Sequence, residues 1–435
     1  MKALTLPSLA PVVIATGLLF SAAPVCADQP QNPLPARQAA EIVNALALDL
    51  LRADALATGN VLFSPYSLQV ALAMSYAGAE GVTRDEMSRV LHYPPAEESL
   101  HTALLALQLY LARIEAQTTA QAEQARHFGG PAEPVQWHMA NRLFGQEGYA
   151  FRKSFLKSMQ DTYQAPLHTV DFKRDAESAR QGMNQWVAGE TQDKIRDLIP
   201  PGVLTPHTRM VLVNAVYLRA PWQQSFNEQA TRPSPFHLQD GREVRVATMT
   251  QRDQLGYAKT AGYEVVTVPY AGGGLQLLVI LPEPGQTLSA VESSLTLDAL
   301  SAAALAPKQQ VQLYLPKLHL EPRSVALGKV LRSLGMTTAF DEPQRSANFD
   351  RLAPRRLPHD YLYIAEVFHK AFLNLDEKGT EAAAATAVIK AVPVSLNPAP
   401  PSEPTIVRVD RPFLFAVQHR SSGTCLFIGR VADPR

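Results

Sequence analysis

The chain has only two cysteines in 435 residues, Cys26 and Cys425. Two cysteines cannot build the disulfide framework that holds small secreted domains together, so a hydrophobic core must stabilise this protein. With 46% hydrophobic and 18% charged residues, the chain is globular and long enough for a large core. Cys425 lies in the apolar run GTCLFIGRV, where a buried small side chain is a better explanation than a nucleophile or a metal ligand.

An excess of charge of either sign is also absent. The chain has 40 Lys and Arg residues against 40 Asp and Glu residues, so its formal net charge is zero. No dense run of Lys and Arg marks a site for a polyanion. The composition therefore predicts no nucleic-acid partner.

The sequence lacks the short motifs that mark common enzymes and metal sites. It has no G-x-S-x-G, no H-E-x-x-H, no G-x-x-x-x-G-K-[ST] and no dinucleotide fingerprint. The glycines of AGGGLQ (residues 271–276) separate two strand-like runs, and a hairpin turn explains them. The 11 histidines show no spacing that is typical of metal ligands. We therefore expect no cofactor, no metal and no enzymatic activity.

The one long apolar stretch stands at the N-terminus. MKALTLPSLAPVVIATGLLFSAAPVCA has one lysine, an apolar centre and a small-x-small pattern at Val25-Cys26-Ala27. These features are typical of a signal peptide at residues 1–27, removed near Asp28, and the stretch is too short and interrupted for a membrane span. The alternative is a lipoprotein signal acylated at Cys26, although Val25 stands where such signals have Gly, Ala or Ser. We expect a secreted or periplasmic protein without a membrane partner, and the lack of Asn-x-Ser/Thr sequons favours a bacterial origin.

Helical patterns dominate the first half of the chain and strand-like patterns the second. Helices are predicted at residues 36–58, 64–79, 83–93, 97–115, 154–165, 176–192 and 323–335. Runs of Val, Leu, Ile, Tyr and Phe predict strands at residues 209–218, 263–271, 275–284, 311–320, 365–376 and 413–421. This order predicts an α+β protein with large, mostly antiparallel sheets.

Three local signals refine these boundaries. Ser64 followed by Pro65 is a good helix start. Thr83 with Glu86 three residues later predicts a capping box for the next helix. Residues 116–134 are polar and interrupted by Gly and Pro, so we expect an exposed insertion there.

The segment DEKGTEAAAATAVIKAVPVSLNPAPPSEP, residues 376–404, is open to several interpretations. The alanines at 382–385 favour a helix, whereas the Pro-rich residues 393–404 are typical of an extended linker. As a strand, the residues from Thr380 to Val392 could all join a ladder, because neither Pro nor Gly interrupts them. Small side chains suit a strand that must slide between two existing strands, and Gly379 would be its hinge.

The whole segment resembles the hinge and reactive loop of the serpins, the serine protease inhibitor family. EVFHKAFLNLDEKGTEAAAATAV resembles their hinge region, and NVLFSPYSLQVALAMSYAGAEGVTRDEM resembles their N-terminal motif. Further matches, in the family's order, are ANRLFGQEG, MNQWVAGETQDKIRDLI, LVNAVYL, LYLPKLHLE, LRSLGMTTAFD and DRPFLFAVQHRSSGTCLFIGRV. The resemblance implies one serpin domain at residues 28–435, with three β-sheets, about nine helices and an exposed reactive loop at about 377–404.

The resemblance also implies a mechanism. A target serine protease attacks a bait bond in the loop and forms an acyl-enzyme with it. The cleaved loop then inserts into the central sheet, and about fourteen residues at about 3.3 Å each carry the tethered protease about 45 Å. The expected partner is therefore a covalently bound protease on a monomeric inhibitor, whose native state is a strained intermediate of kinetic stability. The implied hinge residues are Glu377, Gly379, Thr380, Glu381, Ala382, Ala383, Ala384 and Ala385.

Two counts place the bait bond differently. The usual family spacing from Thr380 gives Pro393–Val394, although proline is a poor residue before the bond for most serine proteases. The run AVPVSLNP resembles the reactive segment of antitrypsin, which gives Val394–Ser395, and bonds around Leu396 are a third alternative. We favour Val394–Ser395. All three alternatives indicate an elastase-like protease that prefers medium aliphatic residues.

The resemblance assigns roles to residues outside the loop as well. A polar cluster beneath the strands that part during insertion, the shutter, would contain Ser64, Ser67, Asn184 and His369. Trp222 would mark the breach, where the loop first inserts, although YLRAPW departs from the family pattern and places Pro221 in a strand. Glu377 is either a salt-bridge partner at the hinge base or a solvated carboxylate.

Two classes of function remain. A suicide inhibitor needs a hinge of small residues, and Thr380 with Ala382 to Ala385 meets that need. A non-inhibitory serpin, acting as carrier, chaperone or protease substrate, would tolerate bulky, charged or proline residues there. Lys390 belongs to the inward-facing set, and we expect its ammonium to reach water near the far end of the sheet.

Overall fold

The structure is a computed structural model that describes residues 34–53, 56, 58–128, 133–163, 165–321, 323–355, 361–381 and 403–435. The described residues belong to one unit that begins at Pro33. None of the helices in these ranges is both long and apolar enough to cross a bilayer.

Helices make up most of the first half of the described chain, as predicted. The nine α-helices of the described residues are α1 (Leu34–Arg52), α2 (Pro65–Gly78), α3 (Gly81–Val90), α4 (Glu97–Phe128), α5 (Lys153–Tyr163), α6 (Phe172–Glu190), α7 (Leu288–Ser294), α8 (Leu297–Ala304) and α9 (Gly328–Ser333). The predicted start of α2 is confirmed, since the hydroxyl of Ser64 accepts a hydrogen bond from the N–H of Ser67 at 3.3 Å and Pro65 opens the helix.

The predicted capping box of the next helix is wrong. Helix α3 begins at Gly81, and Thr83 lies inside it, fully buried. The hydroxyl of Thr83 instead accepts the N–H of Asn348 at 3.0 Å, and Glu86 accepts the N–H of Thr338 at 2.8 Å. Both residues therefore hold a distant segment of the chain, which a local sequence pattern cannot distinguish from a cap.

The predicted exposure of residues 116–134 is confirmed for most of residues 116–126, but this first part is helical instead of irregular. Helix α4 continues to Phe128, because Ala, Gln and Glu are good helix formers and no breaker occurs before Gly129. Thr118, 2% exposed, accepts the N–H of Val135 at 3.0 Å, so this part of α4 packs against the fold. The helix predicted at residues 323–335 is shorter in the structure, where α9 spans only Gly328–Ser333 and the short strand β11 precedes it.

Strands fill the second half of the chain. They are β1 (Val61–Phe63), β2 (Gln136–Gln146), β3 (His168–Val170), β4 (Met210–Pro221), β5 (Arg232–His237), β6 (Glu243–Thr260), β7 (Tyr263–Pro269), β8 (Leu275–Pro282), β9 (Lys308–Pro316), β10 (Leu318–Leu320), β11 (Val325–Ala326), β12 (Ile364–Leu375), β13 (Gly379–Thr380), β14 (Thr405–Arg408), β15 (Phe413–His419) and β16 (Thr424–Val431). All six predicted strand segments contain strands, whereas the long β2 and β6 were not predicted.

Hydrogen bonds join the described strands into two sheets. One has nine strands in the order β1-β16-β15-β8-β7-β6-β9-β14, with β5 beside β6. The other, called the central sheet below, has seven strands in the order β10-β12-β13-β4-β2-β3, with β11 beside β12. Strand β6 is 18 residues long and pairs with β5, β7 and β9, so it joins two of the three expected sheets into one network.

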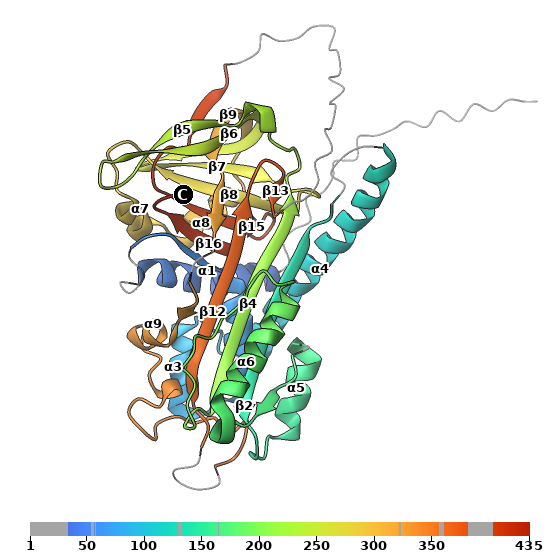
Figure 1. Ribbon diagram of the computed structural model, residues 1–435, viewed down its shortest axis with the longest axis vertical. Coiled ribbons are helices and arrows are strands. Elements are labelled where there is room, and N and C mark those ends of the chain that lie inside the picture. The colour runs from blue at the N-terminus through green and yellow to red at the C-terminus, as the bar shows by residue number, and fades with distance from the viewer. Residues whose placement is uncertain are drawn as a thin grey trace, which may run out of the picture. The chain divides into compact units, whose positions relative to one another are not determined.

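The central sheet is covered on both faces. Figure 1 shows β12, β4 and β2 as long neighbouring strands with α6 lying along them. Phe172, Met183 and Val187 of α6 form a core with the outward-facing side chains of these strands, such as Tyr217 and Phe368. The opposite face packs on the main core, to which α2 contributes. Because both faces are buried, β4 is a continuous apolar run instead of an alternating one.

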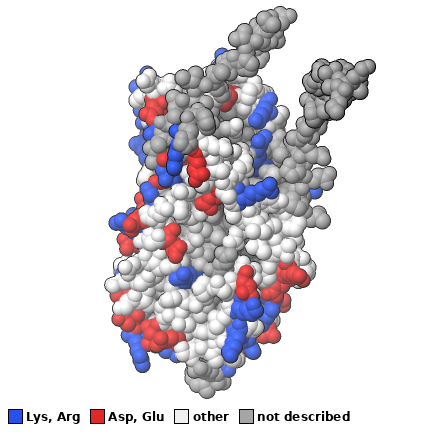
Figure 2. Space-filling model, turned by 90° about the vertical axis from the view of Figure 1, so that its right-hand side faces the viewer, with Lys and Arg blue, Asp and Glu red and all other residues white. Residues whose placement is uncertain are grey.

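Charged side chains are distributed over the surface without a strong bias. On the described part of the face drawn in Figure 2, Lys and Arg are interspersed with Asp and Glu. This distribution agrees with the formal net charge of zero.

Candidate functional site

The short strand β13 lies between β12 and β4 at one end of the central sheet. Thr380 pairs with Leu375 of β12 and with Ala220 of β4, antiparallel to both strands. Its side chain is fully buried, and its hydroxyl lies 2.7 Å from that of Tyr270. The chain that leads to the predicted loop therefore already occupies the first position between the two strands. From Ile364 to Phe372, β12 pairs directly and in parallel with β4.

Gly379 is required by its surroundings. Its φ of +151° lies in a region that favours glycine, and a Cβ there would meet the carbonyl oxygen of Ala220 at 2.2 Å and the Cα of Pro221 at 2.6 Å. Only glycine lets the backbone approach β4 this closely. The predicted hinge role of Gly379 concerns movement, and it stays a prediction.

Glu381 marks the end of the inserted segment. Its φ of +55° is left-handed, which is uncommon for a residue with a side chain and turns the chain away from the strand direction. Its N–H donates to the carbonyl of Asn374 at 2.7 Å, and its carboxylate forms an ion pair with Lys194, which follows α6. The remaining hinge residues, Ala382 to Ala385, lie outside the described residues, as do the alternative bait-bond residues Pro393, Val394 and Ser395.

Trp222 anchors the chain on the N-terminal side of the hinge. It is fully buried, its ring stacks on Tyr270 at 4.5 Å, and its indole N–H donates to the carbonyl of Asp376 at 2.9 Å. The backbone N–H of Trp222 donates to the carbonyl of Lys378 at 2.9 Å. Pro221 is tolerated because it is the last residue of β4, where its carbonyl accepts the N–H of Ala271 at 2.8 Å.

Glu377 is an ion-pair partner, which is the first of the two predicted alternatives. It is 7% exposed, and it accepts from the ammonium of Lys317 at 2.8 Å and from the hydroxyl of Thr231 at 2.7 Å. Burial raises the pKa of this carboxyl group, but the bonds from Lys317 and Thr231 outweigh burial and lower the pKa below its ordinary value. The charged form of Glu377 is therefore stabilised at the base of the hinge.

A row of polar side chains crosses the central sheet below β13. His369 of β12 pairs in register with Asn214 of β4, which pairs in register with Asn141 of β2. The amide of Asn214 donates to the hydroxyl of Ser67 at 2.5 Å and also to the carbonyl oxygen of Asn141. Ser64 joins the cluster, since its N–H donates to Nε2 of His369 at 3.1 Å. We call these five residues the polar row.

The hydrogen bonds of His369 define its protonation. Its Nε2 accepts from a backbone N–H, so Nδ1 must carry the proton and donate to Oδ1 of Asn214. The ring is fully buried, and this burial lowers its pKa to about 3. A neutral histidine thus bridges the two strands that would have to part.

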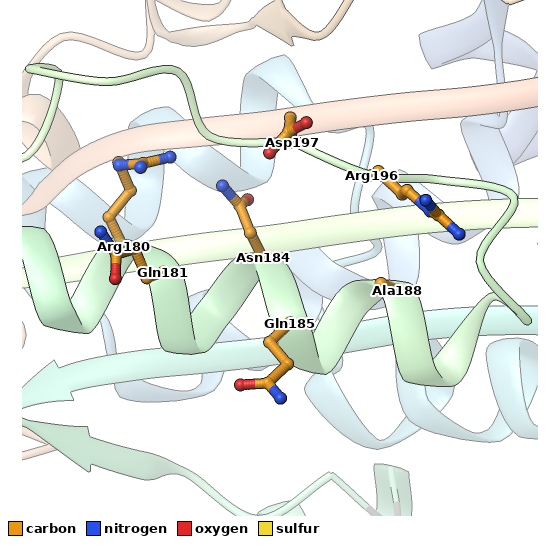
Figure 3. Close-up of a pocket in the computed structure, with 7 residues that line it drawn as sticks. All are labelled: Arg180, Gln181, Asn184, Gln185, Ala188, Arg196 and Asp197. Carbon is orange, nitrogen blue, oxygen red and sulfur yellow. The ribbon is translucent and has the colours of Figure 1, made fainter.

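Asn184 lies elsewhere. It belongs to α6, and its amide bonds the main chain of Ile199 in both directions, at 3.0 and 2.9 Å. Figure 3 shows its side chain between α6 and the segment at Asp197, on the border of an open cavity of about 260 Å³. The structure brings together Ser64, Ser67 and His369 of the predicted shutter, but not Asn184, which holds the segment after α6 on the face of the sheet.

Sequence reasoning missed four residues of this site. Asn141, Asn214, Tyr270 and Lys194 all contact predicted site residues, namely Ser67, His369, Thr380 and Glu381 respectively. The two asparagines stand in apolar runs, ANRLF and LVNAV, and a polar residue inside a buried run is a signal that could have found them. Tyr270 and Lys194 carry no such signal, because their neighbours are distant in sequence.

These features define a class of protein. An α+β fold with a buried central sheet carries a two-residue strand, β13, between the ends of two long strands, and the left-handed Glu381 follows it. A hydrogen-bonded row crosses the line along which further insertion would proceed.

The chain belongs to the serpin family. The model of the family described as "Serpin (serine protease inhibitor)" matches residues 41–434. A leukocyte elastase inhibitor of Sus scrofa is 34% identical over 399 residues, which covers 89% of this chain and 97% of the relative. An uncharacterized serpin-like protein of Thermococcus kodakarensis is also 34% identical and covers 90% and 85%. The native structure of tengpin, a thermophilic serpin, is 26% identical in sequence and superposes with a TM-score of 0.75. The match covers 92% of this chain and 94% of tengpin. The predicted family and fold are confirmed.

Proposed function

We propose that this protein is a suicide inhibitor of an extracellular or periplasmic serine protease, trapping it covalently through insertion of the cleaved loop. The observation that carries the proposal is the position of Thr380, seated between β12 and β4 with both ladder partners. A strand that continued from Thr380 in the same direction would separate β12 from β4, because the two pair directly from Phe372 and Tyr217 onward.

Insertion of a further strand would have to break the polar row. The bond between His369 and Asn214 crosses the junction of β12 and β4, so an inserted strand would separate the two residues. Insertion would also break the direct ladder between β12 and β4, but the inserted strand would bond to both neighbours, so about one full ladder would be gained. At about 1 kcal/mol net for each hydrogen bond, a gain over about a dozen residues exceeds the loss of the polar row, which supports the proposal that insertion is favourable.

The proposed target is an elastase-like protease. Several relatives are named leukocyte elastase inhibitors, including those of Sus scrofa and Rattus norvegicus. The aliphatic residues around the favoured bait bond, Val394–Ser395, suit the same class of protease. The pattern of residues 1–27 supports export of the mature monomer, so the target would be met outside the cytoplasm.

Incubation with a pancreatic-type elastase tests the proposal. We expect a covalent adduct that withstands denaturant, and mass spectrometry of the released C-terminal fragment identifies the bait bond. Complete cleavage without an adduct, across a panel of serine proteases, would contradict the proposal and support a non-inhibitory serpin.

A substitution at the hinge tests whether inhibition requires loop insertion or only binding of the protease. Thr380→Arg places a charge where the structure has a fully buried hydroxyl, so insertion should stop and the protein should become a substrate. Thr380→Ser is the matched control and should still form the adduct. Normal inhibition by the arginine variant would exclude loop insertion as the mechanism.

A further inference from the structure

Strand β14 forms an edge of the nine-stranded sheet, and it follows the segment that contains the predicted bait bond. It pairs in parallel with β9 on one side, and no described strand pairs with its other side. Its residues alternate, since Val407 is 1% exposed whereas its neighbours Ile406 and Arg408 are exposed, Ile406 by 59%. A sheet edge that carries an exposed isoleucine is a place where another protein can pack.

The exposed side chains of β14 belong to a surface that continues over β9 and β6. Residues that pair in register point to the same face of a sheet. We call two such rows the outer face: Arg408, Tyr314 and Thr250 in one row, and Ile406, Gln312 and Arg252 in the other. The opposite side of the same strands packs in the main core through Val407, Leu313 and Met249.

Contacts between neighbouring strands hold the outer face in a fixed arrangement. The guanidinium of Arg408 lies 4.0 Å from the centre of the Tyr314 ring. The side-chain amide of Gln312 donates to the hydroxyl of Thr250 at 2.7 Å. Because these side chains are already ordered, a partner that packs on them would immobilise little that is free.

The charge of the outer face is positive. Arg252 and Arg408 are its two charged residues, and no carboxylate among the described residues pairs with either guanidinium. Asp253 alternates with Arg252 and points to the opposite side of the sheet, and Glu403 precedes β14. Arginine and tyrosine are residue types that are enriched at protein interfaces. The outer face therefore fits a partner with an acidic surface.

The position of the bait bond indicates which partner reaches the outer face. The favoured bond ends at Ser395, and Thr405 begins β14 ten positions later. A chain of ten residues spans at most about 36 Å when fully extended. A protease of about 230 residues has a radius of gyration of about 17 Å and is therefore about 40 Å wide. Since the connecting chain is shorter than the protease is wide, a protease at the bait bond has the outer face within reach of its surface.

We propose that the outer face docks the target protease through an acidic part of that protease's surface. This inference rests on the proposed function. Arg252 and Arg408 attract the acidic surface, and Ile406 packs against an apolar side chain of the protease. Docking raises the rate at which the protease reaches the bait bond, because complementary charge accelerates association. The outer face thereby selects among proteases that cleave the same bond.

The rate at which a protease cuts the loop tests the proposal, whether or not an adduct follows. The probes are an anionic and a cationic elastase of the pancreatic type, and the measurement is the second-order rate constant for loss of the intact chain. We expect the rate of the anionic enzyme to fall as salt rises from about 0.05 M to about 0.5 M, because salt screens the attraction. Arg252→Glu combined with Arg408→Glu should slow the anionic enzyme at least about tenfold at low salt, and it should not slow the cationic enzyme.

Arg323→Glu combined with Lys329→Glu is the matched control. Both residues are exposed, and they lie at α9 and shortly before it, at the opposite end of the structure from β9 (Figure 1). This variant has the same net charge as the outer-face variant and should be cut as fast as the unmodified protein. Equal slowing of the two variants would overturn the proposal, as would a salt-independent rate of the anionic enzyme or no cutting by it at all.

The yield of adduct per cut chain, measured in the same samples, reports on the proposed function alone. Adduct formation at a rate that ignores the charge of the outer face would keep suicide inhibition and refute the docking face. Charge-dependent cutting without an adduct would keep the docking face and contradict suicide inhibition.

Discussion

At the scale of single residues, the hinge depends on contacts made by three neighbours. Gly379 admits the chain beside β4, Thr380 occupies the buried position, and Glu381 turns the chain outward. The ion pair of Glu381 with Lys194 fixes this turn to the segment after α6. In the proposed mechanism, insertion competes with hydrolysis of the acyl-enzyme, so a hinge that is already positioned shortens the first step.

Lys194→Gln should therefore make insertion faster, because the inserting strand must straighten at Glu381 and break the ion pair that holds the turn. A partly exposed ion pair is worth about 0.5–1 kcal/mol, so its loss should raise the rate of loop insertion after cleavage about two- to fivefold. The measurement is the rate of loop insertion after cleavage by elastase, followed by stopped-flow fluorescence. Arg196→Gln is the control, because Arg196 pairs with Asp193 in the same segment and does not touch the hinge. A similar rise in both variants would argue against a specific role for the Lys194–Glu381 pair.

His369 should make the stability of the protein depend on pH. Its pKa is about 3 in the folded protein, whereas an unfolded histidine has a pKa of about 6.5. The unfolded chain therefore binds the proton first as the pH falls, and the free energy of unfolding decreases between about pH 6.5 and pH 3. From pH 7 to pH 5 this residue should contribute a loss of about 2 kcal/mol.

Denaturant unfolding of His369→Gln at pH 7 and pH 5 measures this contribution. The variant should be less stable than the unmodified protein at pH 7, because it disturbs the polar row. Its further loss on acidification should be smaller by about 2 kcal/mol, since glutamine does not titrate. An equal loss in the two proteins would mean that His369 is not the group responsible.

At the scale of helices and strands, the sequence predicts what short-range patterns determine. The start of α2 follows from Ser64 and Pro65 alone, and the strand at β8 from its apolar run. Helix α4 runs further than predicted. The polar composition of residues 116–128 suggested irregular structure, but these residues contain no Gly or Pro and remain helical.

The pairing of strands explains why the site was predicted only in part. His369, Asn214 and Asn141 are brought together by the register of β12, β4 and β2, whose sequences lie far apart in the chain. The family resemblance supplied His369, Ser64 and Ser67, but it could not show that Asn184 faces Ile199 instead of the row. Register and helix orientation depend on tertiary packing, and a single sequence does not contain them explicitly.

At the scale of the whole molecule, the central sheet is arranged so that one more strand can be added. Strand β13 stops after two residues, and beyond it β12 and β4 satisfy each other's backbone groups. In the uncut chain, the segment after β13 must return to β14 at Thr405 in the other sheet, and this connection limits how far β13 can be extended. If cleavage releases the loop, residues after Thr380 can enter the sheet and form ladder bonds on both sides.

Cleavage should therefore make the protein more stable to heat. At about 1 kcal/mol for each ladder bond gained, a strand of about a dozen residues adds on the order of 10 kcal/mol, which corresponds to a rise in unfolding temperature of about 10 °C for a chain of this length. The measurement is thermal unfolding followed by circular dichroism, before and after a single proteolytic cut within residues 382–402. Thr380→Arg, cut at the same bond, should unfold at the temperature of the uncut protein, because a buried arginine at this position blocks insertion. Thr380→Ser should gain stability as the unmodified protein does. An unmodified protein that unfolds at one temperature whether cut or uncut would show that its native state stores no strain that insertion can release.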